Sequence, residues 1–132
     1  MSQENEEVVR SFIADWAPNL DAMKKSYRDH LTEDVYWESV GSTPHEGLEE
    51  AIRHLDELRE QNGMEYCTAD ILHIASDGDV VLTERVDRMH RADGSVLADF
   101  RIMGAFELRD GRICRYSDYL DMARAAQVLG RA

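Results

Sequence analysis

The stretch Val81-Leu82-Thr83-Glu84-Arg85-Val86-Asp87-Arg88-Met89 decides the fold, because it predicts a β-strand with apolar residues on both faces. Side chains two positions apart on a strand point to the same side, so Thr83, Arg85 and Asp87 share one face with Val81 and Met89. Burying a guanidinium and a carboxylate costs several kcal/mol unless the two groups satisfy each other. We therefore interpret Arg85 and Asp87 as functional residues, over which the rest of the chain builds a pocket.

Three more strands and one short strand surround this segment. Glycine-containing turns at 77–78, 92–94 and 110–111 separate runs that alternate in polarity. We expect these strands to form an antiparallel meander. The predicted strands are 35–40, 64–75, 80–90, 96–108 and 112–119.

Apolar residues recur at helical spacing in the first half of the chain and once more at its end. The predicted helices are 4–17, 20–30, 47–61 and 121–129. Three helices that pack on one side of a meander make an α+β domain. The sequence thus predicts a single domain over residues 1–132, in which a curled sheet and its helices enclose a cavity.

Composition and charge narrow the class of partner. The formal net charge is −12 and the sequence pI is about 4.7, which argues against nucleic acid and anionic membrane surfaces. A small neutral or apolar substrate fits better. The chain has no apolar run long enough to span a membrane and no signal peptide at its start, so we expect it in the cytoplasm.

The cysteines and histidines do not predict a metal site or a cofactor. Cys67 and Cys114 both lie in strand-like sequence, where a buried free thiol is favoured over a disulfide. The five histidines are scattered, without the spacing of metal ligands. We expect no metal and no cofactor.

A third charged residue, Asp118, lies near the end of the last strand. In a meander, the strands that carry Asp87 and Asp118 flank strand 96–108, so a curved sheet brings both carboxylates to Arg85. Two carboxylates that share one arginine can hold different protonation states. Opening an epoxide with water needs a base for the water and an acid for the ring oxygen, without a metal or a covalent nucleophile.

These motifs resemble those of the limonene epoxide hydrolases, a family of the nuclear-transport-factor-like superfamily. The similarity is most specific at Thr83-Glu84-Arg85-Val86-Asp87, Gly104-Ala105-Phe106-Glu107-Leu108 and Ser117-Asp118-Tyr119-Leu120-Asp121. It implies a cystatin-like roll, with a curved, mixed but mostly antiparallel sheet of six strands and helices that close a conical pocket. It also implies a homodimer.

The resemblance assigns a role to each polar residue of the motifs. It implies that Asp118 activates water, Asp87 protonates the epoxide oxygen, Arg85 bridges the two carboxylates and Tyr36 helps to orient the water. The family has an asparagine two residues after the tyrosine, where this chain has Glu38. Ionised glutamate only accepts hydrogen bonds, so its role differs.

The segment 38–44 also resembles a loop of ketosteroid isomerases, in which Glu38 would act as a base at carbon. The positions of that family's oxyanion hole align with Phe12 and Met103, which cannot donate a hydrogen bond. An isomerase or polyketide cyclase is therefore the alternative enzyme, and a non-catalytic ligand-binding module remains a third hypothesis.

The bulky apolar residues on the predicted pocket face are expected to form its wall. Arg85 and Asp87 could instead form a structural pair on a solvated face, and Asp118 could cap the last helix, although Asp121 is the better candidate for that cap. The expected wall residues are Trp37, Met23, Leu72, Met89, Met103 and Phe106.

Overall fold

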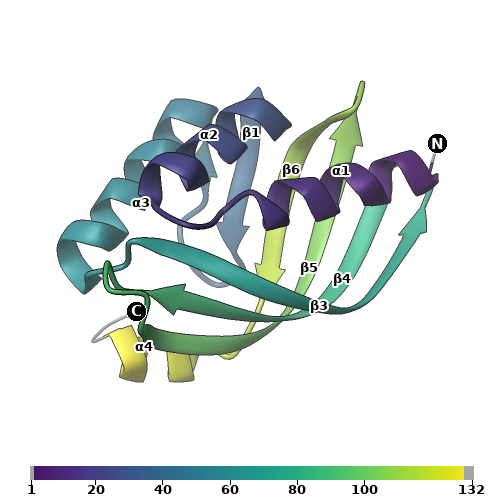
Figure 1. Cartoon of the computed structure of the whole chain (residues 1–132). Helices are drawn as coiled ribbons and strands as arrows, with labels where there is room; N and C mark the ends of the chain where they lie inside the picture. The colour runs from purple at the N-terminus through teal and green to yellow at the C-terminus, as the bar shows by residue number, and fades with distance from the viewer. Residues whose placement is uncertain (1, 130–132) are drawn as a thin grey trace.

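The computed structural model describes residues 2–129 and contains one six-stranded, strongly curved sheet (Figure 1). The strand order is β2-β1-β6-β5-β4-β3. Neighbouring strands are antiparallel except β1 and β6, which pair in parallel. The strands are β1 (Leu31–Ser39), β2 (His45–Glu46), β3 (Tyr66–Asp77), β4 (Val80–His90), β5 (Val96–Arg109) and β6 (Arg112–Tyr119).

Helices cover the concave side of this sheet. The first, α1 (Ser2–Ala14), lies across β3 and β4, while α2 (Leu20–His30) and α3 (Leu48–Asn62) pack together beside β1 (Figure 1). The fourth, α4 (Met122–Leu129), packs against β5. The fold is therefore α+β, as the sequence predicts. No helix among residues 2–129 has the length and apolar character needed to cross a membrane.

Local sequence signals set the helix ends. The Asn19 side chain accepts a hydrogen bond of 2.8 Å from the backbone N–H of Ala22, which caps the start of α2. Gly63 ends α3 in the left-handed conformation, with φ of +79°. The Asp121 side chain accepts from the backbone N–H of Arg124 at 3.1 Å. Asp121 therefore supplies the cap of α4, as predicted, and Asp118 is free for another use.

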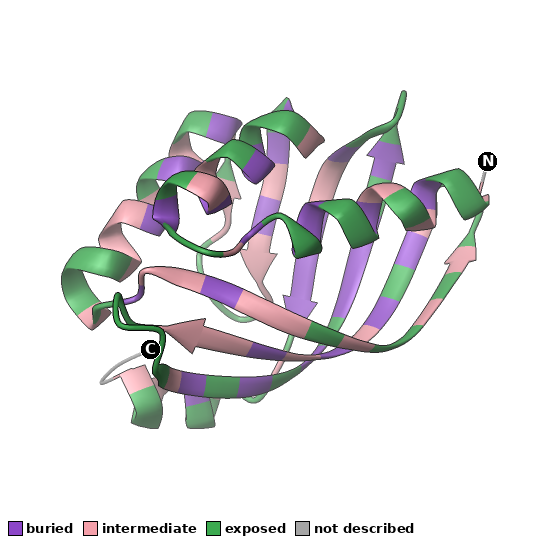
Figure 2. Ribbon diagram, in the orientation of Figure 1, coloured by how far each residue is buried: buried purple, intermediate pink, exposed green. Residues whose placement is uncertain are grey.

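Burial alternates along β4 as its sequence predicts (Figure 2). Val81, Thr83, Arg85 and Asp87 are buried on the concave face, whereas the residues between them are partly or fully exposed. The charged pair is therefore in the interior, and the alternative of a structural pair on a solvated face is wrong.

Some boundaries differ from the predicted ones. The bounds of α2, β4 and β6 agree with the sequence prediction, but β1 begins at Leu31, before the predicted start at residue 35. Leu31 and Val35 are both buried, which extends the strand backwards. The two-residue strand β2 was not predicted, because two residues are too few to show alternation.

The predicted free thiols are confirmed, but only one is fully buried. Cys67 and Cys114 form no disulfide. Cys67 is buried, and its Sγ lies 3.6 Å from Sδ of Met64. Cys114 is half-buried on β6.

Candidate active site

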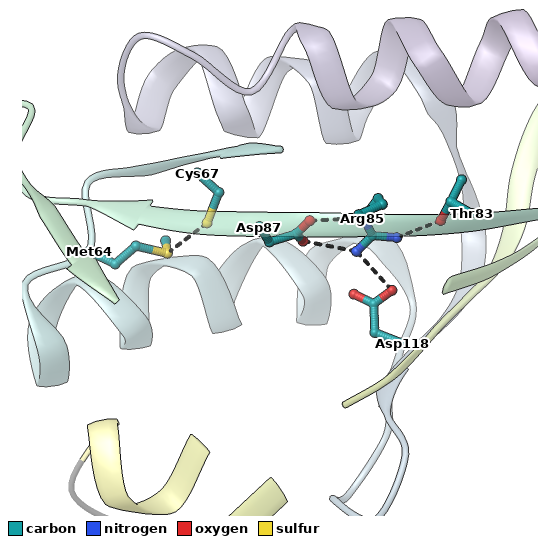
Figure 3. A network of polar contacts seen from close by, with 6 residues as sticks. All are labelled: Met64, Cys67, Thr83, Arg85, Asp87 and Asp118. Carbon is teal, nitrogen blue, oxygen red and sulfur yellow. Dashed lines mark hydrogen bonds and ion pairs between the residues drawn. The ribbon is translucent and has the colours of Figure 1, made fainter. Parts of the chain in front are cut away.

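Arg85 lies at the centre of the buried polar cluster (Figure 3). Its Nε donates to Oδ1 of Asp87 at 2.9 Å, and its Nη2 donates to Oδ2 of the same carboxylate at 2.9 Å. Nη2 also donates to Oδ1 of Asp118 at 3.0 Å. The Arg85 residue is only 1% exposed, with Asp87 and Asp118 at 8% and 6%. One guanidinium thus bridges two carboxylates from strands that do not adjoin each other.

The third nitrogen of the guanidinium and its flat face have partners as well. Nη1 of Arg85 donates to the Thr83 hydroxyl at 3.0 Å, and the guanidinium carbon lies 5.7 Å from the centre of the Phe106 ring. Sequence reasoning gave Thr83 no role, although it stands two residues before Arg85 on the same face. A buried arginine needs this number of partners to offset its desolvation.

Gly104 provides the space in which the cluster forms. It pairs with Thr83 on one side and with Asp118 on the other. A Cβ at this position would collide with Nη1 of Arg85 and lie 2.9 Å from Oδ1 of Asp118. The absent side chain therefore lets Arg85 reach across β5 to β6.

A pocket of about 880 Å³ opens above the two carboxylates. Asp87 and Asp118 both contribute to its lining, together with Trp37, Met23 and Met89, which the sequence predicts as wall residues.

Three predicted wall residues lie elsewhere. Leu72 is 50% exposed, because the pairing of β3 with β4 shifts between Ile71 and His73 and interrupts the alternation there. Met103 is 52% exposed on the outer face of β5, opposite to Gly104. Phe106 points inward but is fully buried below the pocket, where it packs on Tyr116 and Arg85.

The expectation that Tyr36 and Glu38 face the pocket is also wrong. Neither residue contributes to its lining, whereas Trp37 and Ser39 do. Glu38 accepts a hydrogen bond of 2.9 Å from the Ser117 hydroxyl on the opposite side of the sheet. Ser39 pairs with Asp118 in the parallel register of β1 and β6, so these two residues are cross-strand neighbours that both line the pocket. Strand parity was the signal that could have identified Ser39.

Burial and the charge of Asp87 raise the pKa of Asp118 to about 6, against the opposing effect of Arg85. Burial lowers the pKa of Arg85, but the charges and hydrogen bonds of Asp118 and Asp87 outweigh it and raise this pKa well above its ordinary value, so the guanidinium stays charged. Burial also raises the pKa values of the Tyr27 and Tyr116 hydroxyls, which remain protonated donors near the carboxylates.

The cluster can therefore perform acid–base chemistry in a space largely shielded from solvent. A trio of one guanidinium and two carboxylates is electrically neutral when one carboxyl group carries a proton, which reduces the cost of burial. One carboxyl can then donate a proton while the other accepts one. Within residues 2–129, no three histidine, cysteine or acidic side chains come together in a way that could hold a metal ion.

Comparisons with known proteins agree with this geometry. The model of a family described as the limonene-1,2-epoxide hydrolase catalytic domain matches residues 3–131. "Epoxide hydrolase EphG" of Mycobacterium tuberculosis (strain ATCC 25618 / H37Rv) is 34% identical over 92 residues, which are 70% of this chain and 58% of that protein. The chain thus matches less than two thirds of the length of this curated relative.

Solved structures show the same fold. An M. tuberculosis protein described as an LEH-like epoxide hydrolase superposes with a TM-score of 0.77 at 26% identity, covering 97% of this chain and 90% of that one. A putative SnoaL-like polyketide cyclase from Jannaschia sp. CCS1 has a TM-score of 0.78 at 16% identity, with 99% and 94% covered. The second likeness concerns the fold alone.

Proposed function

Because the chain belongs to the limonene-1,2-epoxide hydrolase catalytic-domain family, we propose that it is an epoxide hydrolase that adds water to a predominantly apolar epoxide by one-step acid–base catalysis. The observation that carries this proposal is the bridge from Arg85 to Asp87 and Asp118 beneath a pocket that both carboxylates line. The names of the M. tuberculosis relatives support the reaction class.

In the proposed reaction, Asp118 removes a proton from water while the water oxygen attacks an epoxide carbon. The carbon–oxygen bond of the ring breaks, and its electron pair takes the proton of Asp87. The product is a vicinal diol, with Asp118 protonated and Asp87 ionised. Transfer of one proton from Asp118 back to Asp87 restores the starting state, so the reaction consumes only water and needs neither a metal nor a cofactor.

The raised pKa of Asp118 supports its role as the base. A base works best when its pKa is close to the working pH, and the pKa of about 6 brings Asp118 nearer to that value than an ordinary aspartate. Arg85 donates hydrogen bonds to both carboxylates, so its positive charge stabilises the negative charge on either of them during the reaction. Ser39 lies beside Asp118 and supplies a hydroxyl that can orient the water.

Isosteric substitutions test the proposal. Asp118→Asn and Asp87→Asn each keep the shape of the side chain but cannot exchange the required proton. We expect each to lower diol formation from a panel of terpene, cyclohexene and styrene oxides by at least about a hundredfold. Circular dichroism and thermal unfolding serve as controls for folding. Wild-type turnover in either folded variant would refute the mechanism.

The isomerase alternative loses its proposed base, because Glu38 binds Ser117 outside the pocket.

We also propose that the protein forms a homodimer, as its family resemblance implies. Leu82, Met103 and Tyr119 are between 45% and 52% exposed on the outer face of β4, β5 and β6, and this apolar surface supports such a contact.

A further inference from the structure

The pocket wall contains two histidines that the proposed mechanism does not use. His45 on β2 and His54 on α3 both line the pocket, and their rings stack with centroids 4.0 Å apart. Their side chains are 21% and 27% exposed. Both rings also contact Trp37, with centroid distances of 5.4 and 5.2 Å. Packing on the indole and on each other therefore fixes the position of both imidazoles.

A row of aromatic rings connects this pair to the carboxylates. Trp37 stacks on Tyr116 at 5.7 Å, Tyr116 stacks on Phe106 at 5.0 Å, and Phe106 lies under Arg85. Tyr116 and Trp37 thus separate the two histidines from the reacting centre. A ligand that touches both places must be several carbon atoms long, which agrees with a volume near the upper end of the roughly 300–1,000 Å³ of small-molecule pockets.

Each imidazole turns Nδ1 toward a glutamate. Nδ1 of His54 lies 3.4 Å from Oε1 of Glu57, and Nδ1 of His45 lies 3.7 Å from Oε2 of Glu50. Only the contact of His54 is within hydrogen-bond distance, and it favours the His54 tautomer that carries its proton on Nδ1, which leaves Nε2 of His54 as an acceptor. Among residues 2–129, neither Nε2 atom has a hydrogen-bond partner. This wall of the pocket therefore carries two unpaired Nε2 atoms, and that of His54 is an acceptor.

The two walls of the pocket differ in polarity. The wall formed by the β1–β2 loop, β2 and α3 contains most of the polar lining residues, beside the apolar Leu55 and Leu58; the polar ones are Ser42, Thr43, His45, His54, Glu57 and Gln61. The facing wall, from β4, β5 and the α4 region, contributes Met89, Phe100, Ile102, Leu120 and Met122. Such a pocket suits an amphiphilic ligand better than a pure hydrocarbon.

We propose that His45 and His54 form a subsite for a hydroxyl group of the substrate, so that the preferred substrate is a hydroxy-epoxide with several carbon atoms between the two groups. This inference rests on the proposed hydrolase function. A hydroxyl group donates to Nε2 while the hydrocarbon chain lies along the apolar wall and the epoxide reaches Asp87 and Asp118. The proposal makes the two histidines determinants of specificity.

The charges around the subsite favour a hydroxyl over a carboxylate. Burial lowers the pKa of both histidines, and the pKa of His54 is lowered further by His45, so the rings are neutral near pH 7. Glu57 lines the same wall and would repel an anion, whereas the charge of Glu50 beside His45 is offset by an ion pair with Arg53. A neutral donor avoids this repulsion.

Matched substrates test the subsite. Terminal epoxides of increasing chain length are compared with the same compounds bearing an ω-hydroxyl, an ω-carboxylate or an ω-amine. We expect the ω-hydroxyl compound of the best length to have a kcat/KM about tenfold above that of its unsubstituted analogue. Equal values at every length, or a preference for the acid or the amine, would overturn the proposal.

Substitution of the histidines identifies the contact. The double variant His45→Phe/His54→Phe keeps aromatic rings against Trp37 but removes the nitrogen acceptors, so the tenfold preference should fall to about one. His73→Phe is the matched control, because His73 pairs with Glu84 at 2.9 Å on β3 and its side chain is 84% exposed. A preference that survives in the double variant would overturn the assignment.

Binding measurements distinguish failure of the subsite from failure of the hydrolase proposal. Calorimetry with Asp118→Asn reports affinity for the same epoxides without turnover. Hydroxyl-dependent binding without wild-type turnover would leave the subsite intact and refute the hydrolase. Turnover by the wild type without any hydroxyl preference in binding or rate would refute the subsite and leave the hydrolase proposal intact. The absence of both binding and turnover would refute both proposals.

Discussion

The position of the Arg85 guanidinium depends on Gly104, which has no side chain. Gly104 is required here because a Cβ would occupy the space of the guanidinium, and its backbone needs no left-handed conformation. We expect Gly104→Ala to displace Arg85 and lower turnover by about a hundredfold, since small misplacements of reacting groups have effects of that size. Steady-state kinetics on the wild-type substrate measure this loss.

A glycine outside the site provides the control. An added Cβ at Gly78 meets no neighbour, but φ is +61° in the β3–β4 turn. Gly78→Ala should therefore lower the melting temperature through backbone strain without changing turnover. Normal turnover in Gly104→Ala would show that the cluster tolerates a methyl group and that catalysis does not need the space left by Gly104.

Asp118 also makes stability depend on pH. Its folded-state pKa of about 6 exceeds the value near 3.9 of an unfolded aspartate, so the folded protein binds more protons between these values. This stabilisation is fully present below about pH 4 and is lost as the pH rises through about 6. The free energy of unfolding of the wild type should therefore fall relative to that of Asp118→Asn over this window. Urea titrations at several pH values test this, and a relative rise would contradict it.

At the level of the element, β1 shows which part of the site the sequence could predict. Arg85 and Asp87 were identified because they stand two residues apart on one otherwise mostly apolar face of β4, and Asp118 because the meander places its strand beside strand 96–108. In β1, large apolar residues occur on both faces, with Trp37 inward and Tyr36 outward. The pattern therefore does not reveal which face lines the pocket: Trp37 was correctly assigned to its wall, but the catalytic candidates Tyr36 and Glu38 lie on the opposite face.

Leu72 shows a second limit. The shift in pairing between Ile71 and His73 is set by the geometry of β3 and β4 together, and the sequence of β3 alone does not predict it. The same applies to His45 and His54, which are nine residues apart and meet only because β2 and α3 pack on Trp37.

Because Ser39 and not Glu38 lines the pocket, substitutions at these two β1 positions should differ in effect. Glu38→Gln should leave turnover within about threefold of the wild type, because Glu38 contacts Ser117 outside the pocket. Ser39→Val should lower kcat by about tenfold, because it removes the hydroxyl beside Asp118. The two variants are measured side by side with one epoxide. Loss of turnover in Glu38→Gln together with normal turnover in Ser39→Val would restore the original assignment of the faces.

At the level of the whole molecule, the sheet has two separate uses. Its concave face holds the charged cluster under the helices, while its convex face exposes Leu82, Met103 and Tyr119. If this convex surface joins two copies, Met103→Glu should yield monomers, because it places a charge in an apolar contact. Gln127→Glu adds the same charge on the exposed side of α4 and should leave the dimer intact.

Light scattering on both variants and the wild type measures the mass in solution. A wild-type protein with the mass of a monomer would refute the proposed homodimer without affecting the proposed site.

The claim that Asp118 activates water, rather than attacking the epoxide itself, is tested most directly by a single turnover in oxygen-18 water with enzyme in excess over epoxide. Direct attack by water predicts that the diol from this first turnover carries one oxygen-18 atom and that the protein carries none. A first-turnover diol without the label, with oxygen-18 later found in a carboxylate of the protein, would show a covalent ester and contradict the account.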